Sequence, residues 1–317
     1  MLTSHDVGRR VSVRRLEGDH ARDVVGHLLD LSGEQMAVLR KNGTVATFDP
    51  ADVVAAKVVP AQPVRRAWTV PAVSAAEMQE MCSAGWPARE SARLGTWQLR
   101  AHAGITGRAN SALTVGDPGL AMPEALEAVR EWYDERRLPP LLQLPLADPA
   151  NVAMEELGWR RQHVTIVQVA PVGALLASLP TVDGLTTTVD PTPSPEWRAL
   201  MHDLDRDDPE KHVQILTGPP VVGFATVLRD GEPVGIGRVS VEGRWAGITS
   251  VDVAPTARRQ GVGTAVMRSL VGLAAERGAE ATYLQVRAAN DAALRLYAAL
   301  GYVTHHPYCY RAPVPAS

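Results

Sequence analysis

The sequence is poor in cysteine, in excess charge and in long apolar runs, and each shortage excludes a class of protein. Only Cys82 and Cys309 are cysteines among 317 residues, so a disulfide framework is excluded and a reducing, cytoplasmic location is expected. Lysine and arginine number 32 against 35 acidic residues, which leaves a formal net charge of −3 and no basic field for nucleic acid. No window reaches the roughly 18 consecutive apolar residues of a membrane helix. The N-terminus also lacks the apolar core of a signal peptide, so a soluble protein without a membrane partner is expected.

What remains is an ordinary globular composition, 45% hydrophobic and 21% charged, in a chain long enough for two or three compact units. Residues 1–62 hold five short apolar runs separated by turn signals such as Asn42-Gly43, which predicts a small all-β barrel. The proline-rich stretch from Pro60 to Pro63 predicts a linker. Residues 66–180 and 181–317 mix strand and helix patterns. The predicted fold class is therefore α/β (α+β), with two mixed-sheet units behind the barrel.

The stretch from Gly247 to Tyr302 carries the most informative pattern. Its apolar run WAGITSVDVAP predicts a buried strand, and the following ARRQGVGT leads into a helical pattern that ends at Gly278. Two glycines at a helix entrance let the backbone approach a phosphate, which the first-turn N–H groups and the helix dipole then hold. Adjacent Arg258 and Arg259 add forked donors. This loop therefore suits a phosphate-bearing ligand.

Two common phosphate-binding loops do not fit this segment. A nucleotide triphosphatase loop needs Gly-Lys-Ser/Thr, but Gly263 is followed by Thr264 and Ala265. A dinucleotide-binding loop needs a third glycine where Val266 stands. It also needs a strand–helix–strand unit, whereas the Asp230-Gly231 turn predicts antiparallel hairpins upstream.

A third loop does fit. The run from Arg258 to Gly263 resembles the Arg/Gln-x-x-Gly-x-Gly/Ala loop of the GNAT superfamily of acyl-CoA N-acyltransferases. Downstream, the segment AANDAALRLYAALGY resembles the superfamily's Asn-x-x-Ala-x-x-x-Tyr-x-x-x-Gly-Phe/Tyr pattern, with Asn290, Ala293, Tyr297, Gly301 and Tyr302 in place. The two motifs stand in the right order and at the usual separation. The chain is therefore identified as a member of this superfamily.

The resemblance implies acetyl-CoA as co-substrate, no metal, and direct transfer of the acetyl group to an amine in a ternary complex. The acceptor would be a small molecule or a protein, and nucleic acid is not expected. The resemblance places the CoA pyrophosphate on the loop and the pantetheine arm along the strand. The implied cofactor-binding residues are Val251, Val253, Arg258, Arg259, Gln260, Gly261, Val262, Gly263, Thr264 and Asn290.

Two catalytic groups follow from the same resemblance. The backbone N–H of Val251 would polarise the thioester carbonyl, and Tyr297 would protonate the departing thiolate. Helix packing is the alternative role of Tyr297, and helix capping is the alternative role of Asn290.

The general base is not assigned by the sequence. Many members of the superfamily carry a glutamate four residues before the position of Val251, where this chain has Gly247. The base is therefore left open among Asp252, Glu242, His305, a residue of the first half and a water relay.

The first half resembles the second. LLQLPLADPANVAMEELGW is similar to YLQVRAANDAALRLYAALGY, which an internal repeat explains. In the first copy Asp117 and Pro118 occupy the phosphate loop and Met154 replaces the tyrosine, so it is predicted to be degenerate, serving as support and as one wall of the acceptor cleft. Its polar run from Gly107 to Ser111 is interpreted mainly as turn chemistry.

Between the halves, Ser194-Pro195 predicts the start of a helix through Leu204. The acidic segment from Asp205 to Val213 resembles the part of GNAT folds that shapes the acceptor site, and a solvated loop is preferred to a cation-binding one. The alternative function is a non-catalytic acyl-CoA-binding regulatory protein, motivated by the degenerate half, the missing glutamate and the barrel.

Overall fold

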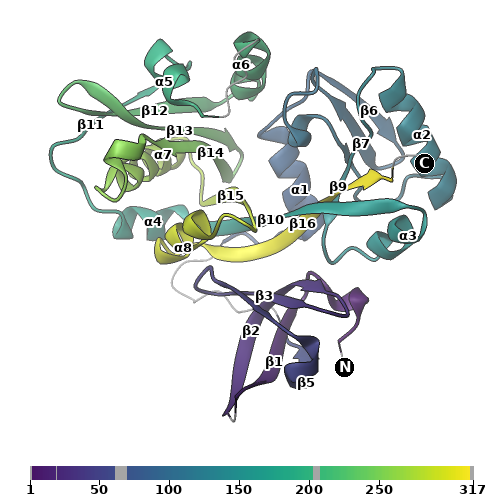
Figure 1. The fold of residues 1–317 in the computed structure, drawn as a ribbon. Coiled ribbons are helices and arrows are strands. Elements are labelled where there is room, and N and C mark those ends of the chain that lie inside the picture. Colours follow the sequence, from purple (N-terminus) through teal and green to yellow (C-terminus); the bar gives the residue numbers. More distant parts are fainter. Residues whose placement is uncertain (1, 19, 61–69, 203–207, 315–317) are drawn as a thin grey trace.

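The computed structural model describes residues 2–18, 20–60, 70–202 and 208–314. The N-terminal part forms a five-stranded antiparallel sheet with strand order β4-β3-β2-β1-β5 (Figure 1). Valines of alternating β1 and β2 positions point into a small core with Leu28 and Phe48. The predicted all-β unit is confirmed. Its elements are η1 (Ser4–Asp6), β1 (Arg10–Glu17), β2 (His20–Leu31), β3 (Met36–Arg40), β4 (Val45–Phe48), η2 (Pro50–Asp52) and β5 (Val53–Val58).

One mixed sheet of eleven strands runs through the rest of the molecule, in the order β11-β12-β13-β14-β15-β10-β16-β9-β8-β7-β6. Each half contributes antiparallel strands followed by one parallel pair, β8 with β9 and β14 with β15. This arrangement confirms the predicted fold class and the internal repeat. The strands are β6 (Glu90–Leu94), β7 (Trp97–Ala101), β8 (Ala112–Leu113), β9 (Leu142–Pro145), β10 (Trp159–Pro171), β11 (Thr186–Asp190), β12 (Val222–Arg229), β13 (Glu232–Glu242), β14 (Trp245–Val253), β15 (Ala281–Arg287) and β16 (Val303–Pro313).

Two long strands join the halves into this single sheet (Figure 1). Strand β10 of the first half pairs with β15 of the second. The last strand, β16, lies between β10 and β9 and so pairs with the first half on both sides. Each half therefore completes the hydrogen bonding of the other.

Helices cover both faces of the sheet. In the second half α7 and α8 lie on one face, with α5 and α6 on the other. A side chain at Gly235 or Gly237 would come within 2.5 Å of the α7 valines, so these two glycines let α7 sit close to β13. The helices are α1 (Ala75–Ala84), α2 (Met122–Asp134), α3 (Ala150–Glu156), α4 (Val172–Ser178), α5 (Pro195–Leu200), α6 (Pro209–Thr217), α7 (Val262–Glu276) and α8 (Asp291–Ala299), with short turns η3 (Gly107–Ala109) and η4 (Pro255–Ala257).

The segment between β11 and β12 differs from the sequence prediction. Helix α5 ends at Leu200 because Met201 turns to an extended backbone, with ψ near 111°, and does not continue to Leu204. Residues 209–213, expected in a solvated loop, form the start of α6, with Asp208 as N-cap and Pro209 in the first turn. Residues 203–207 of the predicted acceptor segment, and residues 61–63 of the predicted linker, lie outside the described residues.

The N-terminal sheet packs on the second half. Leu29 and Leu39 belong to the same buried cluster as Leu294 of α8. The hairpin turn at Gly43 touches the backbone of α8, since a side chain there would come within 2.4 Å of the Leu294 carbonyl. Within the described ranges, no helix is long and apolar enough to cross a membrane.

Candidate active site

Strands β14 and β15 separate partway along their length. Their parallel pairing begins at Trp245 with Ala281 and ends at Ile248 with Leu284, although β14 continues to Val253. The residues of β14 beyond this fork are partly exposed. The two strands thus open a gap in the sheet hydrogen bonding at the carboxyl end of β14.

A β-bulge in β14 lies at the fork. The register shifts between Ile236 and Arg238 of β13, so that Ser250 and Val251 have no cross-strand partner there. Ser250 has a φ of 53°, a left-handed conformation that is uncommon outside glycine. Since the pairing with β15 has already ended, the backbone of Val251 stands outside both ladders. This is the residue whose N–H the family resemblance assigns to the thioester carbonyl.

The predicted phosphate loop follows β14 directly. Gly261 takes a left-handed φ of 80° as the N-cap of α7, and the helix starts at Val262. The N–H groups of Val262, Gly263 and Thr264 occupy the first turn, where a helix offers them no acceptor. A side chain built at Gly263 would find only Val253 nearby, at 3.8 Å, so the approach to this turn is open. These features form a cradle for an anion.

The side chains of the loop brace it from outside. Arg258 donates from Nε to the Val253 carbonyl at 3.3 Å. Gln260 donates to the Thr256 carbonyl at 3.0 Å and accepts from Arg229 at 2.5 Å. Arg259 is exposed, with a left-handed φ of 60°. Both arginines therefore add positive charge beside the first turn of α7.

Helix α8 carries the other two predicted residues. The Tyr297 side chain is only 8% exposed and packs edge-on against Tyr302, with ring centroids 5.7 Å apart. Burial, helped by the negative charge of Asp252, raises the pKa of Tyr297 to about 12, so its phenol stays protonated at neutral pH. Asn290 caps α8 by accepting a hydrogen bond from the Ala293 N–H at 3.1 Å. Both alternative structural roles are thus present.

The absence of a glutamate at position 247 has a steric reason. A side chain built on Gly247 would come within 2.5 Å of the Tyr283 ring, which fills that space from β15. The Tyr283 hydroxyl donates to the Met81 carbonyl at 3.1 Å, and burial raises the pKa of Tyr283 far above its usual value. This tyrosine cannot replace the missing base.

Of the open candidates for the base, Asp252 lies at the fork. It follows Val251, is partly exposed, and accepts a hydrogen bond from the His202 N–H at 3.2 Å. Glu242 pairs with Trp245 at the opposite end of β14. His305 lies on β16, with Nε2 3.1 Å from the Val73 carbonyl.

Neither cysteine can act as a nucleophile at neutral pH. Both are free and buried. Burial raises the pKa of Cys82 to about 12 and that of Cys309 to about 11, which keeps both thiols protonated. In the part of the chain that the structure describes, no three His, Cys, Asp or Glu side chains are arranged to hold a metal ion.

In the first half the β8–β9 pairing also ends early, at Leu113 with Gln143, so the difference from the second half lies in the loop that follows. The loop with Asp117 is tied to the β6–β7 turn, since the Asp117 carbonyl accepts the Thr96 N–H at 2.8 Å. The Gly119 N–H donates to Asp117 Oδ1 at 2.8 Å and is therefore not free for a phosphate, which the Asp117 carboxylate would also repel. The first unit is therefore degenerate.

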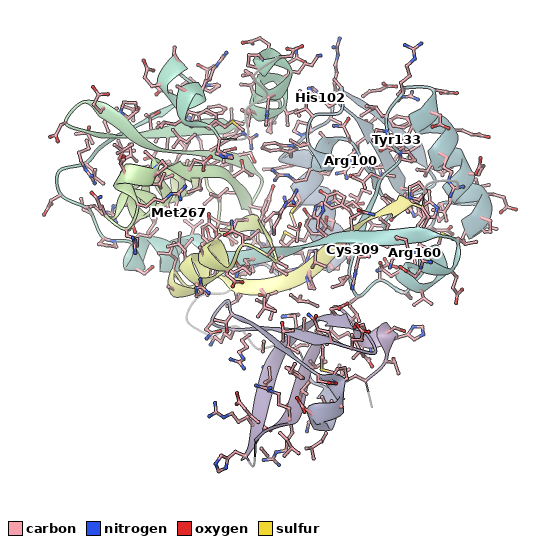
Figure 2. The ribbon with its side chains drawn as sticks, in the orientation of Figure 1. Arg100, His102, Tyr133, Arg160, Met267 and Cys309 are labelled. Carbon is pink, nitrogen blue, oxygen red and sulfur yellow. The ribbon has the colours of Figure 1, made fainter. Side chains whose placement is uncertain are left out.

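Each half contains a fully buried arginine on the strand next to its parallel pair. In the first, Arg100 of β7 donates from Nη2 to Ser111 Oγ at 2.8 Å and lies near Tyr133 (Figure 2). In the second, Arg238 of β13 pairs with Thr249 and donates to its Oγ1 at 3.2 Å. A lone arginine inside the apolar run VGIGRVSV was the sequence signal for Arg238, and sequence reasoning missed it.

Arg238 also ties the first half to the site. It is fully buried, donating to the Leu216 carbonyl at 2.7 Å and to the Gly85 carbonyl, which follows α1, at 3.1 Å. The next residue, Trp86, packs with Ile236 and Trp197 on the α5–α6 face of the second half. The first half thus forms a wall beside the fork.

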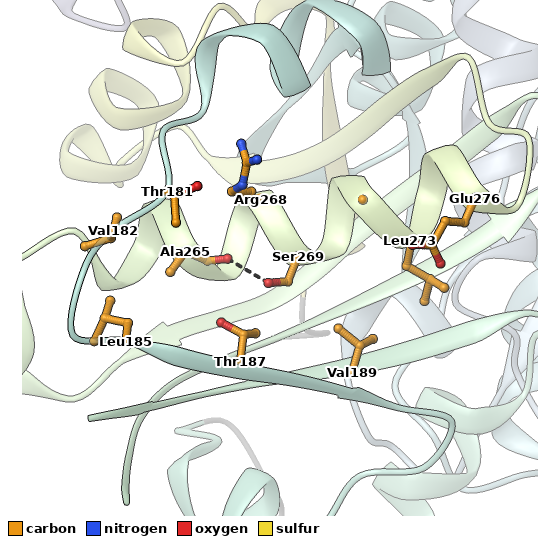
Figure 3. A pocket seen from close by; sticks show the side chains of 11 residues that line it. Thr181, Val182, Leu185, Thr187, Val189, Ala265, Arg268, Ser269, Leu273 and Glu276 are labelled. Atoms are coloured by element: carbon orange, nitrogen blue, oxygen red, sulfur yellow. Dashed lines mark hydrogen bonds between the residues drawn. The ribbon is translucent and has the colours of Figure 1, made fainter. Parts of the chain in front are cut away.

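A separate pocket lies along the other side of α7 (Figure 3). It is lined by α7 residues, by Thr181 and Val182, and by β11. None of the predicted cofactor or catalytic residues lines it. This pocket is therefore distinct from the fork.

Two family models match most of the chain. Residues 75–311 match the family described as "Probable histone acetyltransferase Rv0428c C-terminal", and residues 5–57 match "Rv0428c N-terminal Sm-like domain". The probable histone acetyltransferase Rv0428c of Mycobacterium tuberculosis (strain ATCC 25618 / H37Rv) is 30% identical over 320 residues, covering 96% of this chain and 95% of its own. The "Uncharacterized N-acetyltransferase YobR" of Bacillus subtilis (strain 168) is 29% identical over 243 residues, covering 73% and 96% respectively.

Solved structures share the fold. A GCN5-related N-acetyltransferase from Kribbella flavida superimposes with a TM-score of 0.62 at 21% identity, over 78% of this chain and 98% of that one. A tandem GNAT protein from the clavulanic acid biosynthesis pathway gives a TM-score of 0.52 at 15% identity, over 63% and 73%. The tandem arrangement is thus found in another protein.

Proposed function

Because the chain belongs to the family described as "Probable histone acetyltransferase Rv0428c C-terminal", within the GNAT acetyltransferases, we propose that its second half acetylates an amine at the β14–β15 fork. The enzyme is an acetyl-CoA-dependent N-acetyltransferase with acetyl-CoA as co-substrate. The observation that carries the location is the fork itself, which opens beside the free first turn of α7. We propose the division into residues 1–62, 66–180 and 181–317, and a cytoplasmic location.

In this proposal the CoA pyrophosphate binds the N–H groups of Gly261 to Thr264, next to Arg258 and Arg259. The Gln260 side chain braces the loop. The pantetheine arm takes the place of the missing β15 partner along Val251 and Val253. Asn290, which caps α8 on the opposite side of the fork, contacts the arm.

The chemistry is direct attack of the amine on the thioester. The buried, protonated cysteines support a path without an acyl-cysteine intermediate. The Val251 N–H stabilises the oxyanion that develops on the thioester carbonyl. Asp252 takes the proton that an amine of pKa ~10.4 must lose before attack, and Tyr297 protonates the departing CoA thiolate.

The acceptor is an amine, either a small molecule or a protein. Because the Mycobacterium tuberculosis relative is named a probable histone acetyltransferase, lysine peptides are included among the acceptors to be tested. The test is thiol release from acetyl-CoA with a panel of small amines and lysine peptides. Acceptor-dependent release under saturating acetyl-CoA is expected. Tight CoA binding without any acceptor-dependent release would instead indicate a regulatory protein.

Initial-rate kinetics with both substrates varied test whether transfer is direct. If transfer is direct, initial rates at varied acetyl-CoA and acceptor give intersecting lines in double-reciprocal plots. Parallel lines would require an acetylated enzyme and would contradict a ternary complex.

A further inference from the structure

Arg108 stands out on the wall that the first half presents to the fork. Its guanidinium carbon lies 4.1 Å from the centroid of the Trp86 ring. The side chain is half-buried and makes no hydrogen bond or ion pair with any described residue. The guanidinium N–H groups of an unpaired arginine at this depth can donate hydrogen bonds to a ligand.

The turn that carries Arg108 is firmly held. Asn110 accepts the His102 N–H at 2.7 Å and donates to the Ile105 carbonyl at 2.6 Å. A side chain at Gly107 would meet the Tyr310 ring at 3.5 Å, so the backbone rests on that ring. The predicted turn chemistry thus accounts for Asn110 but leaves Arg108 unexplained.

The surroundings of Arg108 are positive. Arg238 approaches the same Trp86 ring, 5.4 Å from its centroid, and all its hydrogen bonds go to uncharged oxygens. Burial, with a smaller contribution from the charge of Arg108, lowers the pKa of Arg238 to about 9. Among the described residues, no carboxylate is one of the groups whose charges act on Arg238. An anion bound beside Trp86 would relieve this repulsion.

The position of Arg108 relative to the fork indicates which kind of ligand would carry the anion. Arg238 and Ile236 point to the same face of β13, and their partners on β14 are Thr249 and Asp252. Asp252 therefore stands on the face that also holds Trp86. A ligand lying along this face meets a carboxylate at the fork and a guanidinium at the wall.

We propose that the acceptor is an amine that carries a carboxylate, and that Arg108 binds this carboxylate while Asp252 faces the amine. The proposal rests on the proposed function. This further proposal names the acceptor class of that function, which is amino acids and related amino carboxylates. A lysine-rich segment would instead bring its positive charges toward Arg108 and Arg238.

The test compares two acceptors that differ only in the carboxylate, 4-aminobutyrate and butylamine, whose amines have similar basicity. The wild-type protein is expected to acetylate 4-aminobutyrate with the higher kcat/KM. In Arg108→Gln the KM for 4-aminobutyrate rises about tenfold to hundredfold while that for butylamine is unchanged, as for loss of a charge-assisted hydrogen bond. Arg108→Lys, which keeps the charge, recovers part of the preference.

Arg277→Gln is the matched control, because Arg277 is exposed at the far end of α7. It is expected to keep the wild-type preference. Equal kcat/KM for the two amines, or a preference that survives in Arg108→Gln, would overturn the proposal and leave the acetyltransferase intact.

A series of ω-amino acids from glycine to 5-aminopentanoate measures the span between the two ends of the site. A single chain length with the highest kcat/KM is expected, because both charged groups are held by the fold. A flat response across the series would overturn a fixed carboxylate site.

If no amine at all is acetylated, the proposed function fails, and a calorimetric titration with 4-aminobutyrate in the presence of CoA still decides the anion site. Binding that the wild type shows and Arg108→Gln lacks supports the site. Absence of binding in both proteins overturns it.

Discussion

At the scale of single residues, Tyr297 has two explanations that a hydroxyl deletion separates. Its ring packs in the core, but its hydroxyl makes no hydrogen bond to a described residue. Tyr297→Phe is therefore expected to leave the melting temperature unchanged while kcat falls by ~10²-fold, because only the proton for the leaving thiolate is lost. Steady-state rates with a good acceptor and a thermal melt are the measurements.

The neighbouring Tyr302 provides the matched control. Its hydroxyl is hydrogen-bonded to Thr282 Oγ1 at 2.9 Å and lies fully buried. Tyr302→Phe should lower the stability by ~1 kcal/mol and keep kcat. A full-rate Tyr297→Phe enzyme would remove this tyrosine from the mechanism.

Asp252 is the second residue with a specific expectation. Asp252→Asn keeps the shape of the side chain but removes the base, so kcat/KM for a lysine-type amine should fall by ~10²-fold at neutral pH. The loss should shrink as the pH rises, since more of the amine is then already deprotonated. A pH–rate profile measures this. A profile parallel to that of the wild type would exclude Asp252 as the base.

At the scale of elements, the start of α7 determines cofactor affinity. Gly263→Asp places a carboxylate at the open first turn without a backbone penalty, because Gly263 has no positive φ and no close neighbour. Repulsion from the pyrophosphate should raise the Kd for CoA by ~10²-fold, as measured by calorimetry.

Gly272→Asp, in the middle of the same helix and equally unobstructed, is the matched control for helix propensity. It should bind CoA with the wild-type Kd. Equal loss of affinity in both variants would show that the effect comes from the helix and not from the cradle.

The elements also show how far sequence alone reaches. The loop before α7, the helix start at Ser194-Pro195 and the turn at Asn42-Gly43 were predictable because their signals lie within a few residues. The Asp208-Pro209 start of α6 carried such a signal too, but the surrounding charges were interpreted as a solvated loop. A helix-start signal such as Asp208-Pro209 should therefore be given more weight than the charge composition of the segment around it.

Other features were not accessible from local pattern. The placement of β16 between β10 and β9 depends on pairing across about 150 residues, which no motif encodes. The fork at Val251 was implied only by family resemblance, because valine chemistry gives no signal for it. Tyr283 and Arg108 gain their meaning from residues that are distant in sequence, Gly247 and Trp86.

At the scale of the whole molecule, a directed chain of hydrogen bonds runs from the first half to β16. Arg100, which only donates, bonds to Gln143 Oε1 at 2.8 Å, and Gln143 Nε2 bonds to Gln79 Oε1 at 2.6 Å. Gln79 Nε2 must then donate to His306 Nε2, at 2.8 Å. His306 Nδ1 donates to His305 Nδ1 at 2.7 Å, which fixes the tautomer of each ring by the network.

This chain requires neutral histidines. Burial, together with the charges of His305 and His27, lowers the pKa of His306 to about 3. Burial also lowers the pKa of His27, on β2 of the N-terminal sheet, to about 4, with a contribution from His305. These rings connect the N-terminal sheet to the long strand that both halves share.

Acid should therefore weaken the whole assembly before it protonates surface carboxylates. An unfolded histidine titrates near pH 6.5, whereas His306 and His27 stay neutral in the fold down to about pH 3 and 4. Between those values the unfolded chain binds more protons, so the free energy of unfolding falls as the pH falls below about 6.5. The slope should approach ~1 kcal/mol per pH unit for each histidine.

His306→Gln should flatten this pH dependence, measured by denaturant titrations between pH 7.5 and 4.5, whereas exposed His20→Gln should not. If the free energy of unfolding of wild type and His306→Gln fell in parallel with pH, the buried hydrogen-bond chain would tolerate a charged His306.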